Sequence, residues 1–185
     1  MSWVNDIERY NPYNEQEKKD KEMILYYINA FENVLTRENE IAHMTSSAFV
    51  LNKERDKVLM IYHNIYDSWG WTGGHSDGEK DLLAVAIREA REETGIRIAN
   101  PITTEIFSLD ILPVVGHVKN GNYVSAHLHL SVTFLLEADE EEELVIKEDE
   151  NSGVKWIPLD EVVDVSNEPH MKKVYSKIIS KIKLL

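Results

Sequence analysis

The sequence predicts an α/β fold in which a β-sheet is covered by helices on both sides. Two observations support this class. Short runs of β-branched and aromatic residues alternate along the chain with longer segments whose apolar residues recur every three or four positions. The chain has 185 residues, of which 43% are hydrophobic, so it is long enough to bury one substantial core. We therefore expect one main domain with an added terminal element.

An amphipathic helix is expected from Asn14 to about Thr36. Its apolar residues share one helical face: Met23, Tyr27, Phe31, Val34 and Leu35. Asn14 can cap the first turn, and Glu17, three positions later, completes a capping-box pattern. The sequence leaves three roles open for this helix: a dimer contact that would make a homodimer, a lid over a site, or a packing element.

The pattern then changes to strands. Residues 48–51 and 58–62 are short β-forming runs, and the polar segment 52–57 between them predicts a hairpin. Helical spacing returns over residues 81–94 and stops at Gly95, a common residue at helix C-termini.

Three more strands and one helix are expected after residue 95. The strand patterns cover 105–112, 126–136 and 154–157, separated by loops at 116–123 and 137–150. The last helix covers 168–182, with lysines toward its end that suit the helix dipole. The acidic run at 138–143 is interpreted as a solvated loop.

Composition excludes several classes of function. The chain has 33 acidic and 20 basic residues, and its formal charge of -13 repels nucleic-acid polymers and anionic membranes. The absence of cysteine excludes disulfides, thiolate metal sites and a cysteine nucleophile. The polar start does not resemble a signal peptide, and no stretch approaches the roughly 20 apolar residues of a membrane span. A cytoplasmic protein is therefore expected.

The helix expected at 81–94 carries three glutamates on one face. Glu89, Glu92 and Glu93 are three and four positions apart, and apolar residues occupy the neighbouring face. Like charges at these spacings destabilise an isolated helix. A hard divalent cation such as Mg²⁺ takes oxygen ligands and would reverse that repulsion. The arrangement therefore suggests a metal site.

The glutamates by themselves also fit a solvent-facing helix with Arg88 and Arg91 as counter-ions. The Gly73-Gly74 pair shortly before the helix favours the metal site, because glycine permits a close approach of the backbone to a ligand or metal.

Together these residues resemble the Nudix box, whose pattern is a glycine, a glutamate and then Arg-Glu-apolar-x-Glu-Glu-x-Gly-apolar. Gly74 matches the first position. Residues 88–96 read Arg-Glu-Ala-Arg-Glu-Glu-Thr-Gly-Ile and fit every specified position, with Ala90 as the apolar residue. The lead-in from Trp69 also looks like that of the Nudix family.

Two positions depart from the family pattern. Lys80 stands where the family places its first glutamate, and Glu79 lies one residue earlier. In the family this glutamate mainly pairs with the box arginine, so the departure puts the support of Arg88 in doubt more than metal binding. Thr72 stands where a proline commonly precedes the glycine pair, which we interpret as a loop variation.

The resemblance implies an α/β/α sandwich with a mixed sheet at residues 41–185, preceded by a helical extension at residues 1–40. It also implies a hydrolase that uses Mg²⁺ or Mn²⁺ to cleave the diphosphate linkage of a nucleoside diphosphate joined to another group. Metal ions bound to phosphate oxygens would explain how an acidic protein accepts an anionic substrate.

The resemblance also implies roles for individual residues. Glu92, Glu93 and the Gly73 carbonyl would bind metal, Glu89 would be a ligand or the base that activates water, and Arg88 would orient a carboxylate. Glu150 resembles the distant acidic ligand of many family members, although several acidic neighbours compete with it.

The sequence specifies the residues that contact substrate less closely than the metal ligands. Four aromatic residues near the glycine pair could stack on a nucleobase or pack at strand ends: Tyr62, Tyr66, Trp69 and Trp71. Tyr62 and Trp69 are the substrate-binding candidates among them, together with His75, which follows the glycine pair.

His127 and His129 lie two positions apart and face the same side of a strand, which could serve a metal or a phosphate. Because the sequence shows no third ligand, an ordinary polar strand face is the favoured interpretation.

Three other functions remain as alternatives. Isoprenoid diphosphate isomerisation uses a cysteine, which this chain lacks. A nucleotide-binding sensor usually loses a box glutamate, whereas all three are present here. An interaction module would tolerate the change of Glu92 or Glu93 to glutamine without loss of metal affinity.

Overall fold

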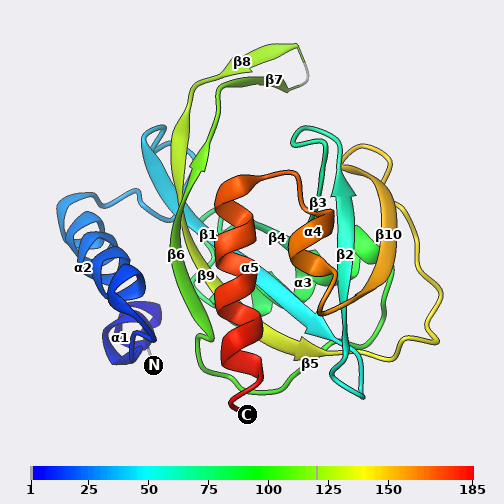
Figure 1. The fold of residues 1–185 in the computed structure, drawn as a ribbon. Helices are drawn as coiled ribbons and strands as arrows, with labels where there is room; N and C mark the ends of the chain where they lie inside the picture. Colours follow the sequence, from blue (N-terminus) through cyan, green and yellow to red (C-terminus); the bar gives the residue numbers. More distant parts are fainter. Residues whose placement is uncertain (1, 120) are drawn as a thin grey trace.

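A mixed β-sheet forms the centre of the molecule, with helices on both faces (Figure 1). The computed structural model describes residues 2–119 and 121–185. Within these residues the main sheet has eight strands: β1 (Ala42–Leu51), β2 (Lys57–His63), β3 (Ser68–Gly70), β4 (Thr72–His75), β5 (Asn100–Pro101), β6 (Ser108–Val114), β9 (His127–Glu137) and β10 (Asn151–Pro158). The described helices are α1 (Trp3–Arg9), α2 (Glu15–Ala30), α3 (Leu82–Thr94), α4 (Val162–Val165) and α5 (Pro169–Ile182).

The strand order is β10-β2-β1-β9-β5, with β3 paired to β2, β4 to β1 and β6 to β9. The central strands β1 and β9 run parallel, and the other pairs are antiparallel. A separate hairpin of β7 (His117–Lys119) and β8 (Asn122–Val124) extends away from the sheet (Figure 1).

Two hydrophobic cores lie on opposite faces of the sheet because successive strand residues point to opposite sides. Ala48 and Val50 of β1 belong to the core that includes Ala86 and Ala90 of α3. Their neighbours Phe49 and Leu51 belong to the other core, which includes Val174, Tyr175 and Ile178 of α5. The chain is therefore an α/β fold with helices on both faces of a mixed, curled sheet, as the sequence predicted.

The central helix begins and ends where its local signals indicate. Asp81 is the N-cap and accepts a hydrogen bond from the backbone N–H of Ala84 at 3.0 Å. Gly95 follows the last turn with φ of 79°, the left-handed conformation that glycine adopts without strain. These two ends fix the position of the three glutamates along α3.

Of the N-terminal helices, α2 packs beside β6 and α1 packs against α2 (Figure 1). The predicted cap is confirmed, because Asn14 accepts a hydrogen bond from the N–H of Glu17 at 2.9 Å. The helix ends at Ala30 rather than near Thr36, and α1 precedes it without having been expected. Among the described residues, α2 packs against β6 and neither helix lines the pocket described below, which supports a packing role, while the dimer contact stays a prediction.

A buried ionic network attaches α2 to the domain. The Glu17 side chain is 0% exposed, and one of its oxygens lies 3.0 Å from Nζ of Lys177 in α5. Lys177 also lies 2.6 Å from Asp110 of β6, and the hydroxyl of Tyr10 donates to Glu17 at 2.6 Å. Burial alone would raise the pKa of Glu17, but the charge of Lys177 and the Tyr10 hydrogen bond outweigh it and hold this pKa below its usual value.

Several strands differ from the sequence-based expectation. β1 begins at Ala42, six residues before the expected run, because its first half is polar and lacks a β-forming signature. The expected loop at 116–123 contains most of the β7–β8 hairpin, and the short strands β3, β4 and β5 were not expected. Among the described residues, no helix combines the length and apolar character needed to span a membrane.

Candidate active site

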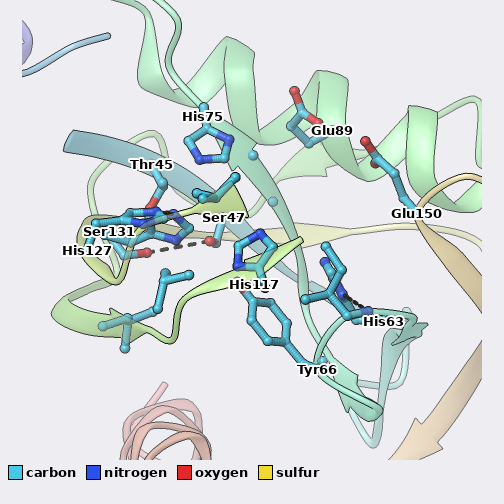
Figure 2. A pocket seen from close by; sticks show the side chains of 18 of the residues that line it. Thr45, Ser47, His63, Tyr66, His75, Glu89, His117, His127, Ser131 and Glu150 are labelled. Carbon is cyan, nitrogen blue, oxygen red and sulfur yellow. Dashed lines mark hydrogen bonds between the residues drawn. The ribbon is translucent and has the colours of Figure 1, made fainter. Parts of the chain in front are cut away.

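A pocket of about 790 Å³ is lined by residues of both α3 and α5 and by side chains of the sheet (Figure 2). The odd-numbered residues at the start of β1 are polar and line it: His43, Thr45 and Ser47. The matching residues of β9 also line it: His127, His129 and Ser131. The parallel register places these two polar rows side by side, and the hydroxyls of Ser47 and Ser131 lie 3.5 Å apart (Figure 2).

The carboxylates expected to bind metal all line this pocket. Glu89, Glu92 and Glu93 belong to α3, and Glu150 immediately precedes β10. Gly73 of β4 also lines it. The structure thus brings together five groups from three separate parts of the chain, each of which offers an oxygen atom.

Glu93 is the most buried of these carboxylates, at 4% exposure. Its Oε2 accepts a hydrogen bond of 2.9 Å from the backbone N–H of Gly73. Burial raises the pKa of Glu93 to about 8, and the charges of Glu150 and Glu89 add to the effect, while the Gly73 hydrogen bond opposes it. A cation at this position would stabilise the ionised form that burial disfavours.

The two glycines of β4 are required by close packing. A Cβ atom on Gly74 would lie 2.5 Å from Cδ of Glu89, and a Cβ atom on Gly73 would lie 2.5 Å from Oγ of Ser47. Any side chain at Gly74 would therefore displace the Glu89 carboxylate. This is the physical reason for the glycine pair at the head of the box.

Two basic side chains, Arg88 and Lys147, contact the carboxylates. Nη2 of Arg88 lies 2.9 Å from Oε1 of Glu89, so Arg88 is placed to orient that side chain. Nζ of Lys147 lies 3.1 Å from Glu150 and 3.8 Å from Glu92. The sequence pattern does not single out Lys147, because this residue lies in the expected loop at 137–150.

Glu79 stays near the start of α3. Its Oε1 accepts hydrogen bonds from the backbone N–H groups of Lys80 at 2.7 Å and Asp81 at 2.9 Å. These hydrogen bonds, with a smaller contribution from the charge of Arg88, lower the pKa of Glu79. Glu79 is therefore held at the start of α3 by backbone hydrogen bonds to Oε1 rather than by an ion pair with Arg88.

The donor set suits a hard divalent cation. Carboxylates and a backbone carbonyl are the ligands that Mg²⁺ and Mn²⁺ prefer. Among the described residues, the lining has eight acidic side chains against two basic ones, Arg37 and Lys147. An anionic ligand would be repelled by this lining unless bound cations offset its charge.

Only one of the three expected substrate-binding residues lines the pocket. His75 lines the pocket, whereas Tyr62 and Trp69 are outside its described lining. Their rings pack edge to face with centroids 5.3 Å apart, and Nζ of Lys155 lies 4.4 Å from the Trp69 ring centroid. Their contact with substrate stays a prediction.

The aromatic side chains that do line the pocket include Tyr66 and Trp71. Trp71 packs edge to face on Tyr175 of α5, with ring centroids 5.5 Å apart, and its backbone N–H donates to the Tyr175 hydroxyl at 3.2 Å. The sequence alone could not rank Trp71 above Trp69, because the distinction depends on where α5 packs.

All seven histidines of the chain lie within the described residues and line this pocket. Four of them, His43, His75, His127 and His129, converge so that one ring nitrogen from each lies within 4.8 Å of the others. The premise that no third ligand faces His127 and His129 is therefore wrong, whereas their interpretation as an ordinary polar face is not tested by this geometry. The sequence could not show this, since the parallel pairing of β1 with β9 brings His43 opposite His129.

Comparison with known proteins identifies the family. The NUDIX domain profile matches residues 41–178, most of the chain. The chain is 30% identical over 128 residues to a Streptomyces rubellomurinus protein named CMP-5'-(N-acetyl-N-hydroxy-3-aminopropyl)phosphonate hydrolase, covering 65% of this chain and 54% of that protein. It is 29% identical over 114 residues to the uncharacterized Nudix hydrolase YvcI of Bacillus subtilis, covering 62% of this chain and 64% of that protein. The matched segments therefore span less than two thirds of either relative.

Solved structures agree on the fold. A Nudix hydrolase from M. smegmatis, RenU, superposes with a TM-score of 0.57 at 15% identity, over 77% of this chain and 87% of that one. The MutT protein from Methanosarcina mazei Go1 gives a TM-score of 0.57 at 13% identity, over 78% of this chain and 98% of that one. The domain profile, the fold and the box residues at the pocket agree, and the chain belongs to the NUDIX domain family.

Proposed function

We propose that this protein is a metal-dependent hydrolase that cleaves the diphosphate linkage of a nucleoside diphosphate joined to a second group. One observation carries the proposal: Glu89, Glu92, Glu93, Glu150 and Gly73 line a single pocket. An interaction module would not require so many carboxylates at one place, because their mutual repulsion has a cost that a cation removes.

Glu92, Glu93, Glu150 and the Gly73 carbonyl would hold Mg²⁺ or Mn²⁺. The bound metal would neutralise phosphate charge and lower the pKa of the attacking water. Glu89 is our candidate for the base that takes the proton from that water, or for a further ligand. Its position is fixed by Gly74, which leaves it room, and by Arg88 at 2.9 Å.

Lys147 can serve the substrate as well as the carboxylates. Its ammonium group is partly buried at the pocket wall, 3.1 Å from Glu150. Once a divalent cation is bound by Glu150 and Glu92, Lys147 would be free to approach a phosphate oxygen as a point charge. Trp71 and Tyr66 offer aromatic faces for a nucleobase in the same pocket.

The pocket residues constrain the identity of the second group on the diphosphate less than they constrain the metal. The name of the Streptomyces relative describes hydrolysis of a CMP-linked phosphonate. Nucleotide-linked phosphonates therefore belong among the substrates to test, together with NDP-sugars, ADP-ribose, dinucleoside polyphosphates, NADH, coenzyme A and nucleoside triphosphates.

The proposal is tested by measuring nucleoside monophosphate or phosphate release from this panel, with Mg²⁺ or Mn²⁺ and with a chelator. We expect turnover of at least one compound class that requires the metal. Tight binding without turnover across the panel would contradict hydrolysis and support a nucleotide sensor.

A further inference from the structure

We propose that His43, His75, His127 and His129 form a second metal site in this pocket, built from imidazole nitrogens rather than carboxylates and selective for a borderline divalent transition metal such as Zn²⁺. The four side chains come from three neighbouring strands: His43 from β1, His75 from β4, and the remaining pair from β9. One ring nitrogen from each lies within 4.8 Å of the other three. Imidazole nitrogens suit Zn²⁺, Co²⁺, Ni²⁺ and Cu²⁺, whereas Mg²⁺ and Mn²⁺ prefer oxygen.

The strand register explains why the four side chains converge. His43 lies opposite His129 in the parallel β1–β9 ladder, and Thr45, two residues after His43, lies opposite His75 in the β1–β4 ladder. His127 precedes His129 by two residues and therefore points to the same face. All four side chains are thus attached to paired backbone rather than to mobile loops, as precise ligand placement requires.

Two of the rings are held by hydrogen bonds through Nδ1, which leave Nε2 unprotonated. Nδ1 of His43 lies 2.8 Å from the carbonyl oxygen of Asn39, and Nδ1 of His127 lies 2.8 Å from that of Ser125. A carbonyl oxygen only accepts, so each Nδ1 carries the proton and each neutral ring presents an unprotonated Nε2. A histidine ligand is commonly oriented in this way, with its other ring nitrogen donating to a carbonyl.

His43 supplies an independent observation. Its side chain is 4% exposed, yet its Nε2 has no hydrogen-bond partner among the described residues. A buried acceptor without a partner is costly and uncommon in native structures. A metal ion within the cluster would satisfy this lone pair.

The spacing of the β9 pair also fits a shared metal. Nε2 of His127 lies 3.2 Å from Nε2 of His129. Two nitrogens bound tetrahedrally to one Zn²⁺, each at about 2.0–2.1 Å, are about 3.3 Å apart. Without a metal, the same separation corresponds to a hydrogen bond in which His129 donates to His127, which is the alternative that the experiment must exclude.

The test measures metal content and ligand field rather than activity. The full chain without a polyhistidine tag is stripped with a chelator and dialysed against Zn²⁺ in excess Mg²⁺, and bound zinc is counted by mass spectrometry. Co²⁺ then replaces Zn²⁺, because four-coordinate Co²⁺ with nitrogen ligands absorbs strongly in the visible range. We expect about one Zn²⁺ per chain, consistent with one four-nitrogen site.

Variants show where the zinc binds. His127→Gln and His129→Gln should each weaken Zn²⁺ binding by about tenfold or more and remove the cobalt bands, with their fold checked by circular dichroism. Two controls should keep both signals: His170→Gln, a pocket histidine outside the cluster, and Glu92→Gln in the carboxylate group. The proposal is overturned if the stripped protein takes up no zinc, if the β9 variants bind it normally, or if Glu92→Gln abolishes binding.

Discussion

The backbone N–H of Gly73 donates a 2.9 Å hydrogen bond to the carboxylate of Glu93, which connects β4 to the last turn of α3. Asn151 of β10 joins the same point, because its side-chain amide donates to the backbone carbonyl of Glu93 at 2.9 Å. The most buried carboxylate of the pocket is thus fixed from both sides before any metal binds.

Glu93 should make the stability of the metal-free protein depend on pH. Its pKa in the folded state is about 8, above the usual 4.5 expected for the unfolded chain. The folded state therefore binds the proton more tightly, and the resulting stabilisation is complete below about pH 4.5 and is lost as the pH rises through about 8. Denaturant unfolding with a chelator should show a larger loss of stability between about pH 5 and about pH 9 in the wild type than in Glu93→Gln, by at least roughly 1 kcal/mol.

The same measurement with Mg²⁺ serves as its control. Added Mg²⁺ should stabilise the wild type at the higher pH and should stabilise Glu93→Gln less, because the ion stabilises the ionised carboxylate. If the two proteins lose stability equally with rising pH, the burial of Glu93 has no energetic consequence.

Gly74→Ala should reduce turnover through Glu89. The new methyl group would lie 2.5 Å from Cδ of Glu89, so the carboxylate must move. A displaced catalytic group commonly costs about 100-fold in rate. Gly70→Ala is the matched control, since its methyl group would meet the Tyr175 hydroxyl at an ordinary 3.6 Å. Equal activities of the two variants would show that the position of Glu89 is unimportant.

Lys147→Gln should strengthen Mg²⁺ binding. Its ammonium group lies 3.1 Å from Glu150 and 3.8 Å from Glu92, where it competes with an incoming cation. A unit charge at about 4 Å in a water-like medium is worth about 1 kcal/mol, or about fivefold in affinity. Calorimetric titration with Mg²⁺ measures this affinity. Lys155→Gln is the control, because Lys155 lies over the Trp69 ring and outside the described pocket lining. Weaker binding in Lys147→Gln would refute the competition.

Glu17→Ala should destabilise the fold by about 3–5 kcal/mol, because it leaves buried cations without their partner. Glu17 is 0% exposed and contacts Lys177, Lys181 and Tyr10. Glu15→Ala is the control, since its side chain is 73% exposed and should change stability by less than about 0.5 kcal/mol. Comparable unfolding midpoints for both variants would mean that α2 is not fixed by this network.

Local signals predicted α3 well. The helical spacing over 81–94, the Gly95 terminus and the glutamate spacing all lie within one helix and need no tertiary information. The same locality predicted the Asn14 cap of α2. It could not show that Glu17 turns inward to Lys177, because that partner lies at the other end of the chain.

The pocket was harder to predict because it depends on strand pairing. His43 and Lys147 carry no local signal and gain their neighbours from the β1–β9 ladder and from the segment before β10. Which of Trp69 and Trp71 lines the pocket likewise depends on the position of α5, which packs against Trp71. Contacts across elements were predictable only where the family resemblance supplied them, as for Gly73 and Glu150 beside the α3 glutamates.

The most direct test of the proposed hydrolase is the Mg²⁺ dependence of substrate hydrolysis in Glu92→Gln, beside Glu148→Gln as an acidic control outside the described pocket lining. The account predicts that wild type and Glu148→Gln release nucleoside monophosphate only with the metal, and that Glu92→Gln loses about 100-fold or more of this rate while remaining folded. Undiminished turnover in Glu92→Gln, or turnover by the wild type in the presence of a chelator, would contradict it.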